Sequence, residues 1–259
     1  MTKLNLRKVS AVRYVTPLRE GGSLPAIIEA DDDGIYVLKF KGAGQGTKAL
    51  IAELILGEIA RAIGLLVPEI VFVELDAGLA LTEADPEISD LIKSSAGLNL
   101  ALDYLPGSVM FNPVVDMPDE HLASLIVWFD ALVSNVDRTI RNTNMLMWHR
   151  RLWLIDHGAS LYFHHTWDNY LEKSKEPFSL INNHVLLKSA NNLMEVDEEI
   201  SSKINTDTFK NIINSIPDEW LNEDQVFKST EENRDAYFNY LIKRMEKPHL
   251  FIEEAVREQ

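Results

Sequence analysis

The stretch that decides the fold is NVDRTIRNTN at residues 135–144, together with LIDHG at residues 154–158. Before it, residues 124–133 carry apolar side chains at spacings of three and four, which predicts a buried helix. Between the two stretches, the apolar runs MLMW and LWLI flank the charged tripeptide HRR and predict a tight hairpin. Because the two ends of a hairpin lie side by side, this pattern places Asn142 next to Asp156.

Asp137, Asn142 and Asp156 are the residue types that transfer of a phosphoryl group requires. One carboxylate faces the acceptor hydroxyl, while an amide and a second carboxylate bind magnesium. Magnesium prefers hard oxygen ligands, takes few of them from protein and fills the rest of its octahedron with water and phosphate oxygens. We therefore predict an ATP-dependent kinase in which Asp137 is the catalytic carboxylate and Asn142 and Asp156 hold magnesium.

Each of these residues also has a simpler interpretation. Asp137 could cap a turn, Asn142 and Asn144 could be ordinary loop formers, and residues 156–158 could be the exit of a strand. The order and spacing of the whole set favour the functional interpretation.

An upstream strand and helix supply a further charged pair. Residues 35–40 follow a DDDG turn and predict a strand in which Lys39 lies among apolar neighbours. Residues 47–63 predict a helix with Thr47 as its N-cap, and Glu53 lies in the apolar part of that helix. We predict that Glu53 pairs with Lys39 and that both belong to the catalytic machinery. The alternative is an edge-strand lysine that reaches into water.

Two glycine-containing loops are candidates for covering phosphate. Gly21, Gly22 and Ser23 lie between the first two predicted strands, and residues 42–46 (GAGQG) precede the predicted helix. Backbone amides of a glycine-rich loop can bind phosphate, but such a loop is usually a flexible connector. We take Gly21, Gly22 and Ser23 as nucleotide-binding candidates, without a longer glycine-rich fingerprint around them.

Taken together, these segments resemble the HipA-like kinases, a bacterial group related to the phosphatidylinositol kinases and more distantly to the eukaryotic protein kinases. The resemblance spans residues 9–160. It rests on YVLKF at 36–40, AEL at 52–54 with GLLVP at 64–68, LDYL at 102–105, the Asp137-Arg138 pair with Asn142, and DHG at 156–158. It implies an α+β, bilobal, protein-kinase-like fold. The N-lobe, residues 1–105, would be a small antiparallel sheet with one main helix, and the C-lobe, residues 106–259, would be mostly helical.

The resemblance also implies roles for individual residues. Lys39 would contact the nucleotide phosphates and Glu53 would brace it. Residues 101–105 would be the hinge that binds adenine through backbone hydrogen bonds, and its cofactor-binding residues would be Asp103, Tyr104 and Leu105.

The chain departs from that family pattern around the predicted catalytic residue. Related kinases often carry a His near the catalytic Asp, whereas Asn135 and Thr139 occupy the neighbouring positions here. The middle residue of Asp-x-Gly is His157 in place of Phe. A nucleotide-binding pseudokinase that acts through a partner stays an alternative, as do phosphorylation of a small molecule or lipid and nucleotidyl transfer on the same fold.

Composition favours a compact cytoplasmic enzyme. A chain of 259 residues with 46% hydrophobic content can bury a sizeable core. The absence of Cys excludes disulfides, thiolate catalysis and Cys-ligated metals. The first residues are too polar for a signal peptide, and no apolar run approaches membrane-spanning length. We expect a soluble bacterial protein with ATP and Mg²⁺ as its cofactors and no membrane partner.

The net charge of −15 bears on the choice of partner. Binding to nucleic acid draws on clustered Lys and Arg, which this sequence lacks, so we expect no direct nucleic-acid partner. The same charge would repel an acidic substrate and favours a basic or neutral protein acceptor. We expect the phosphate to reach a Ser or Thr hydroxyl of a protein or of the kinase itself. The sequence carries no motif that identifies this acceptor or the oligomeric state.

Overall fold

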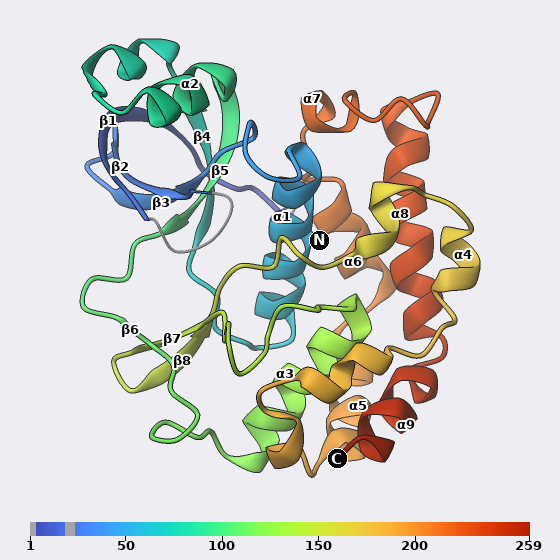
Figure 1. Ribbon diagram of the computed structural model, residues 1–259. Coiled ribbons are helices and arrows are strands. Elements are labelled where there is room, and N and C mark those ends of the chain that lie inside the picture. The colour runs from blue at the N-terminus through green and yellow to red at the C-terminus, as the bar shows by residue number, and fades with distance from the viewer. Residues whose placement is uncertain (1–3, 19–23) are drawn as a thin grey trace. The chain divides into compact units, whose positions relative to one another are not determined.

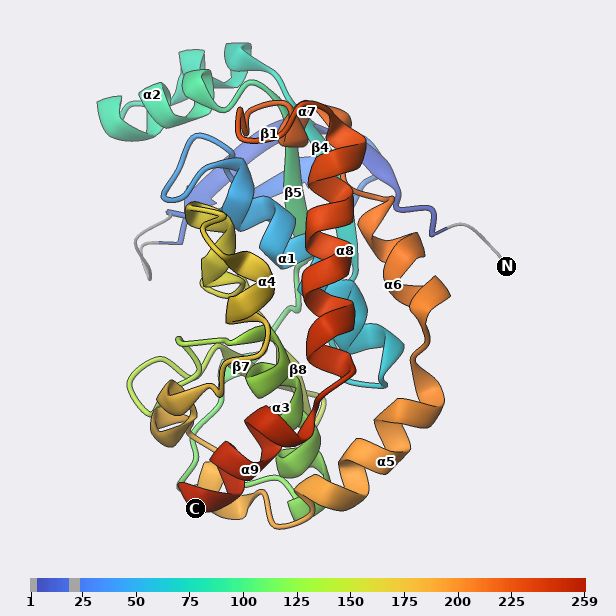
Figure 2. The ribbon, with the colours of Figure 1, turned by 90° about the vertical axis from the view of Figure 1, so that its right-hand side faces the viewer.

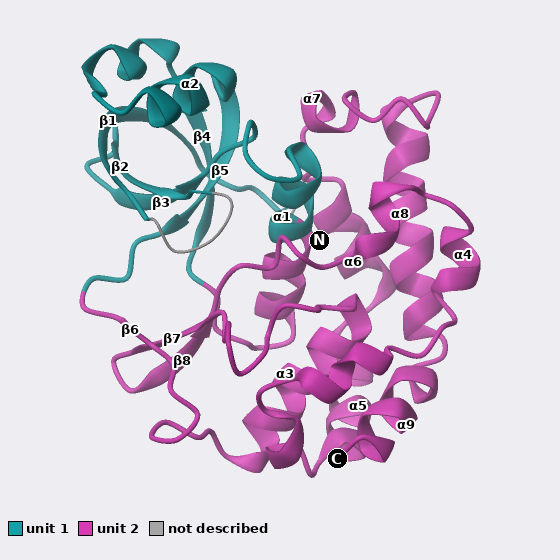
Figure 3. Ribbon diagram, in the orientation of Figure 1, with its two compact units in different colours: residues 1–54, 68–106 teal, residues 55–67, 107–259 magenta. Residues whose placement is uncertain are grey.

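The computed structural model describes residues 4–18 and 24–259. Its contacts divide the chain into two compact units, which are drawn in different colours in Figure 3. Unit 1 comprises residues 1–54 and 68–106, and unit 2 comprises residues 55–67 and 107–259. Residues 55–67, which the predicted N-lobe includes, group with unit 2.

Unit 1 is built around a closed barrel with the strand order β1-β2-β3-β5-β4 (Figure 1). Neighbouring strands run antiparallel, except that β1 pairs in parallel with β4 and thereby closes the barrel. The strands are β1 (Lys8–Pro17), β2 (Ala26–Ala30), β3 (Ile35–Lys39), β4 (Ile70–Leu75) and β5 (Gly97–Asp103).

Side-chain alternation along β3 separates the buried face of the strand from its outer face. Tyr36, Leu38 and Phe40 are buried in the hydrophobic core of the barrel. Successive side chains of a strand point to opposite faces, so Lys39 lies on the outer face of the strand. The 3-10 helix η1 (Ala77–Thr82) and the helix α2 (Pro86–Ser94) add further apolar side chains to this core.

The helix α1 (Thr47–Ala62) crosses the division between the units, because residues up to 54 belong to unit 1 and the rest to unit 2. Its end is set by Gly64, which adopts φ 98° in the left-handed region. Leu65 N–H then donates to the Ala60 carbonyl at 2.9 Å, a bond typical of a glycine-terminated helix. The predicted helix over residues 47–63 is therefore confirmed.

The central helix of unit 2 is α3 (Glu120–Val133), in which residues 123–133 are all buried. Asp119 begins the helix by accepting a hydrogen bond from Leu122 N–H at 2.8 Å. The helices α8 (Thr230–Met245) and α9 (His249–Arg257) pack against it (Figure 2). The apolar residues predicted over 124–133 thus face neighbours all around the helix.

A small antiparallel sheet combines one strand that precedes α3 with two strands that follow it. Its strand order is β6 (Val109–Met110), β7 (Met145–Trp148) and β8 (Arg151–Leu154). The predicted hairpin is present, because Met145 pairs with Leu154 and Trp148 with Arg151.

The remainder of unit 2 is helical. It contains the 3-10 helices η2 (Tyr162–His165), η3 (Ser179–Asn183) and η4 (Leu187–Ser189), and the α-helices α4 (Tyr170–Lys173), α5 (Leu193–Lys203), α6 (Thr206–Ile213) and α7 (Asp218–Leu221). Within the described ranges no helix is long and apolar enough to span a bilayer. The predicted α+β class, with a small sheet near the N-terminus and a mostly helical C-terminal part, is confirmed.

Candidate active site

In unit 1, the predicted ion pair between β3 and α1 is present. Lys39 Nζ donates to Glu53 Oε2 at 2.7 Å. The Glu53 side chain is fully buried and that of Lys39 is 15% exposed. A buried carboxylate is costly unless it is paired, so Glu53 holds the ammonium of Lys39 in place on the outer face of β3.

The predicted hinge, residues 101–105, comprises the last residues of β5 and the two residues that follow it. Asp103 N–H donates to Glu69 O at 2.8 Å, and Tyr104 N–H donates to Ile35 O at 3.0 Å. Among the residues that the structure describes, the N–H of Leu105 has no such backbone acceptor. Burial, and then the neighbouring Glu69, raise the pKa of the Asp103 carboxyl above its ordinary value. The candidates Gly21, Gly22 and Ser23 lie outside the described residues.

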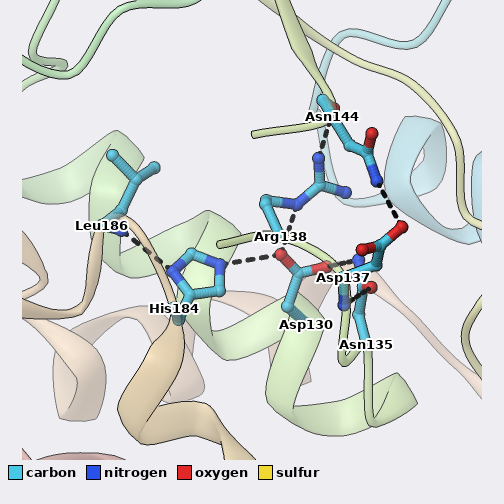
Figure 4. Close-up of polar contacts among 7 residues, drawn as sticks. All are labelled: Asp130, Asn135, Asp137, Arg138, Asn144, His184 and Leu186. Carbon is cyan, nitrogen blue, oxygen red and sulfur yellow. Dashed lines mark hydrogen bonds and ion pairs between the residues drawn. The ribbon is translucent and has the colours of Figure 1, made fainter. Parts of the chain in front are cut away.

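In unit 2, the loop after α3 presents Asp137 between amide groups. Asp137 Oδ2 accepts hydrogen bonds from Asn142 Nδ2 at 2.9 Å and from Asn144 Nδ2 at 3.2 Å. The N–H of Asp137 donates to Asn135 Oδ1 at 3.1 Å (Figure 4). Because these donors are neutral amides, they orient the carboxylate without neutralising its charge.

At the open end of the β7–β8 hairpin, the structure shows which residue lies opposite the segment that leads into Asp156. Ile155 N–H donates to Asn144 O at 3.0 Å, so Asn144 is the residue directly opposite the exit of β8. Asn142 lies two positions earlier in the loop. Asn144 and Asp156, on either side of this bond, both adopt left-handed backbone, with φ of 47° and 57°. Such conformations in residues other than Gly are uncommon and cluster at functional sites.

The model of the HipA-like kinase family matches residues 11–253 of this sequence. The chain belongs to the HipA-like kinase family. The predicted family is confirmed, and the match extends well beyond residue 160, where the recognised resemblance ended. Membership of this family supports a kinase-like phosphotransferase. No curated protein sequence matches the chain at a significant level.

Two solved structures are similar to this HipA-like kinase over most of its length. The crystal structure of the Helicobacter pylori proinflammatory kinase CtkA has 13% identity and a TM-score of 0.53, and the match covers 98% of each chain. The Golgi casein kinase has 11% identity and a TM-score of 0.50, over 99% of this chain and 74% of that one. At these identities the likeness shows the fold alone, and it confirms the predicted kinase-like fold.

Beneath Asp137, this HipA-like kinase contains a buried polar network that the sequence analysis missed (Figure 4). At its centre is Asp130 on α3, whose side chain and that of Arg138 are both fully buried. Oδ2 of Asp130 accepts from Arg138 Nε at 2.5 Å and contacts His184 Nε2 at 2.8 Å, and its Oδ1 accepts from Asn135 Nδ2 at 2.9 Å. Three partners thus share one buried carboxylate.

Charge and tautomer in this network follow from the hydrogen-bond pattern. Burial by itself would raise the pKa of the Asp130 carboxyl, but Arg138 and the hydrogen bond from His184 outweigh it and hold that pKa well below its ordinary value. His184 Nδ1 accepts from Leu186 N–H at 3.0 Å, which assigns the ring proton to Nε2. His184 therefore donates from Nε2 to the same Asp130 oxygen that accepts from Arg138 Nε.

A second buried cation, Arg244 on α8, closes the C-terminal end of α3. Arg244 Nη2 and Nε donate to the carbonyls of Ala131 and Leu132 at 2.7 and 2.6 Å, and Nη1 donates to Glu176 O at 3.0 Å. The last carbonyls of a helix have no partner within it and carry partial negative charge, so a cation there stabilises the end. The guanidinium also lies 5.0 Å from the centre of the Phe251 ring.

Of the residues that the sequence analysis missed, one carried a readable signal. Asp130 is the single charged residue in the apolar run that predicts α3, and a lone acid in such a run requires a buried partner. His184 and Arg244 carry no comparable signal, because neither lies in a motif and their partners are far away in the sequence.

Proposed function

We propose that this HipA-like kinase uses ATP and Mg²⁺ to phosphorylate a protein hydroxyl, on Ser or Thr of an acceptor or of the kinase itself. The observation that carries the proposal is the Asp137 carboxylate, held by two neutral amides beside the strand that leads to Asp156. A carboxylate is a group that can orient a hydroxyl and accept its proton. It lies in a chain whose family supports a phosphotransferase.

In this proposal Asp137 orients the acceptor hydroxyl and takes its proton. The hydroxyl oxygen forms a bond to the γ-phosphorus of ATP, the bond from that phosphorus to the β–γ bridging oxygen breaks, and ADP leaves with the bonding electrons. The amides of Asn142 and Asn144 hold one oxygen of Asp137, which leaves the other to face the acceptor. Positioning and proton acceptance of this kind act in the transition state.

Nucleotide binding is assigned to unit 1. Lys39, braced by Glu53, would bind the phosphates, and the hinge formed by Asp103, Tyr104 and Leu105 would bind adenine. Leu105 supplies the hinge N–H that no described acceptor occupies, which makes it the donor to a ring nitrogen in this proposal.

The residues present fit a divalent cation that is completed by phosphate. No group of three or more His, Cys, Asp and Glu side chains suited to a metal occurs in residues 4–18 and 24–259. Magnesium needs only one or two carboxylates when nucleotide phosphates and water supply its other ligands. Asp156, with an amide oxygen from the segment that holds Asn142 and Asn144, supplies that small set of hard oxygens. When bound, the cation would neutralise charge on the transferred phosphoryl group.

The acceptor is proposed from charge. The sequence has a net charge of −15, which favours approach of a basic or neutral protein segment over an acidic one. A cytoplasmic location, where ATP and Mg²⁺ are supplied together, is part of the same proposal.

The test is incubation of the purified protein with Mg²⁺ and with ATP labelled at the γ-phosphate or, separately, at the α-phosphate. We expect γ-label to appear on the protein itself or on a basic test protein such as histone, and no α-label. The matched control is Asp137→Asn, which keeps the size of the side chain and removes its basicity.

Three results would overturn parts of this proposal. Transfer of α-label would show nucleotidyl transfer. Binding of ATP without transfer of either label would show a pseudokinase. Label on lipid extracts but not on protein would show a lipid kinase on the same fold.

A further inference from the structure

We propose that His184 is a positioning residue for the catalytic loop. The inference rests on the proposed function, because it assigns the support of the same site. His184 Nε2 contacts Asp130 Oδ2 at 2.8 Å although the two residues are 54 positions apart in the sequence.

The support begins with a closed circuit of hydrogen bonds around the catalytic residue. Asp130 bonds to Arg138, whose Nη1 donates to Asn144 O at 2.5 Å. Asn144 bonds to Asp137 through its side chain, and Asp137 N–H bonds to Asn135, which returns to Asp130 (Figure 4). Asn135 and Arg138 lie on either side of Asp137 in the sequence, so one buried carboxylate fixes the turn from both sides.

His184 is the member of this assembly that comes from a distant segment. It lies between η3 and η4, and its chain is also joined to the loop by a backbone bond from Val185 N–H to Arg138 O at 3.1 Å. A bridge between Thr139 and His184 adds a further backbone contact. The segment after the Asp-x-Gly sequence is thereby tied to the loop that carries Asp137.

The His184 bond also sets the geometry of Arg138. His184 and Arg138 donate to the same oxygen of Asp130, so the direction of the carboxylate depends on both. Without the imidazole donor, Asp130 keeps only Asn135 and Arg138 as side-chain partners, so its carboxylate turns toward Arg138 and the bond from Arg138 to the Asn144 carbonyl shifts with it. A displacement of about 1 Å at a reacting group can lower a rate about a hundredfold.

Two polar substitutions of His184 separate positioning from packing. In His184→Gln, the longer side chain places its amide nitrogen near the position of Nε2 and can donate to Asp130. In His184→Asn, the shorter side chain places its amide near Nδ1 and cannot reach Asp130. Both remove the ring, so any loss of packing is shared between them.

The first measurement is steady-state transfer of γ-phosphate. We expect His184→Gln to keep kcat within about threefold of wild type, and His184→Asn to lose at least about tenfold in kcat with an unchanged KM for ATP. Equal kcat in the two variants would overturn the positioning role.

The second measurement is hydrogen exchange of a peptide covering residues 135–144, which requires no activity. We expect faster exchange in His184→Asn than in wild type and little change in His184→Gln. If wild type transferred no phosphate, the proposed function would fail while this exchange difference still decided the role of His184. If both variants exchanged faster to the same extent, His184 would contribute only packing.

Discussion

Two buried ion pairs, one in each unit, are built differently. In unit 1, Lys39 and Glu53 join a strand to a helix at 2.7 Å, and the lysine side chain keeps 15% of its surface exposed. In unit 2, Asp130 and Arg138 are both fully buried, and the carboxylate has Asn135 and His184 as additional partners.

The difference distinguishes an ion pair that can bind a ligand, in unit 1, from an ion pair that holds the structure of a loop, in unit 2. An ammonium on a flexible stem can turn from a carboxylate toward a phosphate, whereas the planar guanidinium of Arg138, buried and bonded to two acceptors, cannot change partners at low energetic cost. The pair in unit 1 therefore has the properties of a binding group, and the pair in unit 2 those of a scaffold.

The largest effect is expected on phosphate transfer, from substitution of Asp137. Asp137→Asn should lower phosphate transfer about a thousandfold or more, because proton acceptance and orientation are lost in the transition state. ATP affinity, measured by calorimetric titration, should stay within about twofold of wild type. Full activity of Asp137→Asn would contradict the assignment of Asp137.

Substitution within the Asp130–Arg138 pair should lower the free energy of unfolding. Asp130→Asn leaves the guanidinium of Arg138 buried without a counter-charge, and breaking such a pair costs about 3–5 kcal/mol. The control is Glu53→Gln, which should cost less, about 1.5–3 kcal/mol, because Lys39 can turn its ammonium toward water. Urea unfolding measures both, and equal costs would remove the distinction between the two pairs.

The same carboxylate should make stability depend on acidity. The folded-state pKa of Asp130 lies below the unfolded value, so the charged form contributes stability above about pH 4, the ordinary carboxyl range. That contribution is lost as the pH falls through the lower, folded-state pKa. The gap in unfolding free energy between wild type and Asp130→Asn should therefore narrow between about pH 5 and pH 2 in urea titrations. A gap that stayed constant over that range would exclude this linkage.

Substitutions in the Lys39–Glu53 pair should weaken nucleotide binding. Lys39→Met should weaken the binding or the alignment of Mg–ATP by about tenfold to a hundredfold. The reason is that the substitution removes the positive charge that would contact the phosphates. Glu53→Ala should produce a milder form of the same defect by releasing the lysine. Calorimetric ATP titration beside the transfer assay measures this, and wild-type behaviour of both variants would contradict a phosphate-binding role.

The smallest effect is expected from the two asparagines, Asn142 and Asn144, that are candidates for the metal-binding amide. Asp156→Asn should weaken Mn²⁺ binding in the presence of nucleotide the most, since it removes a charged ligand. If Asn142, which lies five residues after Asp137, supplies the metal-binding amide, Asn142→Ala should weaken Mn²⁺ binding several-fold. Asn144→Gly removes the amide and is compatible with the left-handed backbone at this position. If the residue opposite Ile155 supplies the metal-binding amide, Asn144→Gly should weaken Mn²⁺ binding more than Asn142→Ala does. Electron paramagnetic resonance of Mn²⁺ distinguishes these two outcomes.

The features that could be predicted from the sequence are those in which a local pattern isolates one residue. Strand alternation singled out Lys39, and the apolar face of a helix singled out Glu53, so their pairing needed only adjacent elements. The helix α3 and the β7–β8 hairpin follow equally local patterns.

The features that could not be predicted depend on distant pairing or on register. Closure of the barrel joins residues 8–10 to residues 72–74, and no periodicity encodes which strands pair. Hydrogen-bond register, not residue spacing, placed Asn144 opposite Ile155. His184 reaches Asp130 across 54 positions from a segment without a repeating pattern.

Arg244 has a consequence for how the kinase is made. Its guanidinium closes the end of α3 that leads into the catalytic loop, yet it lies 112 residues after Leu132. A ribosome that adds about 5–20 residues per second needs roughly 6–20 seconds to cover that stretch. During this interval the nascent chain holds the Asp137 loop but lacks the cation that terminates its supporting helix. The end of α3 therefore receives this cation only after α8 has been synthesised.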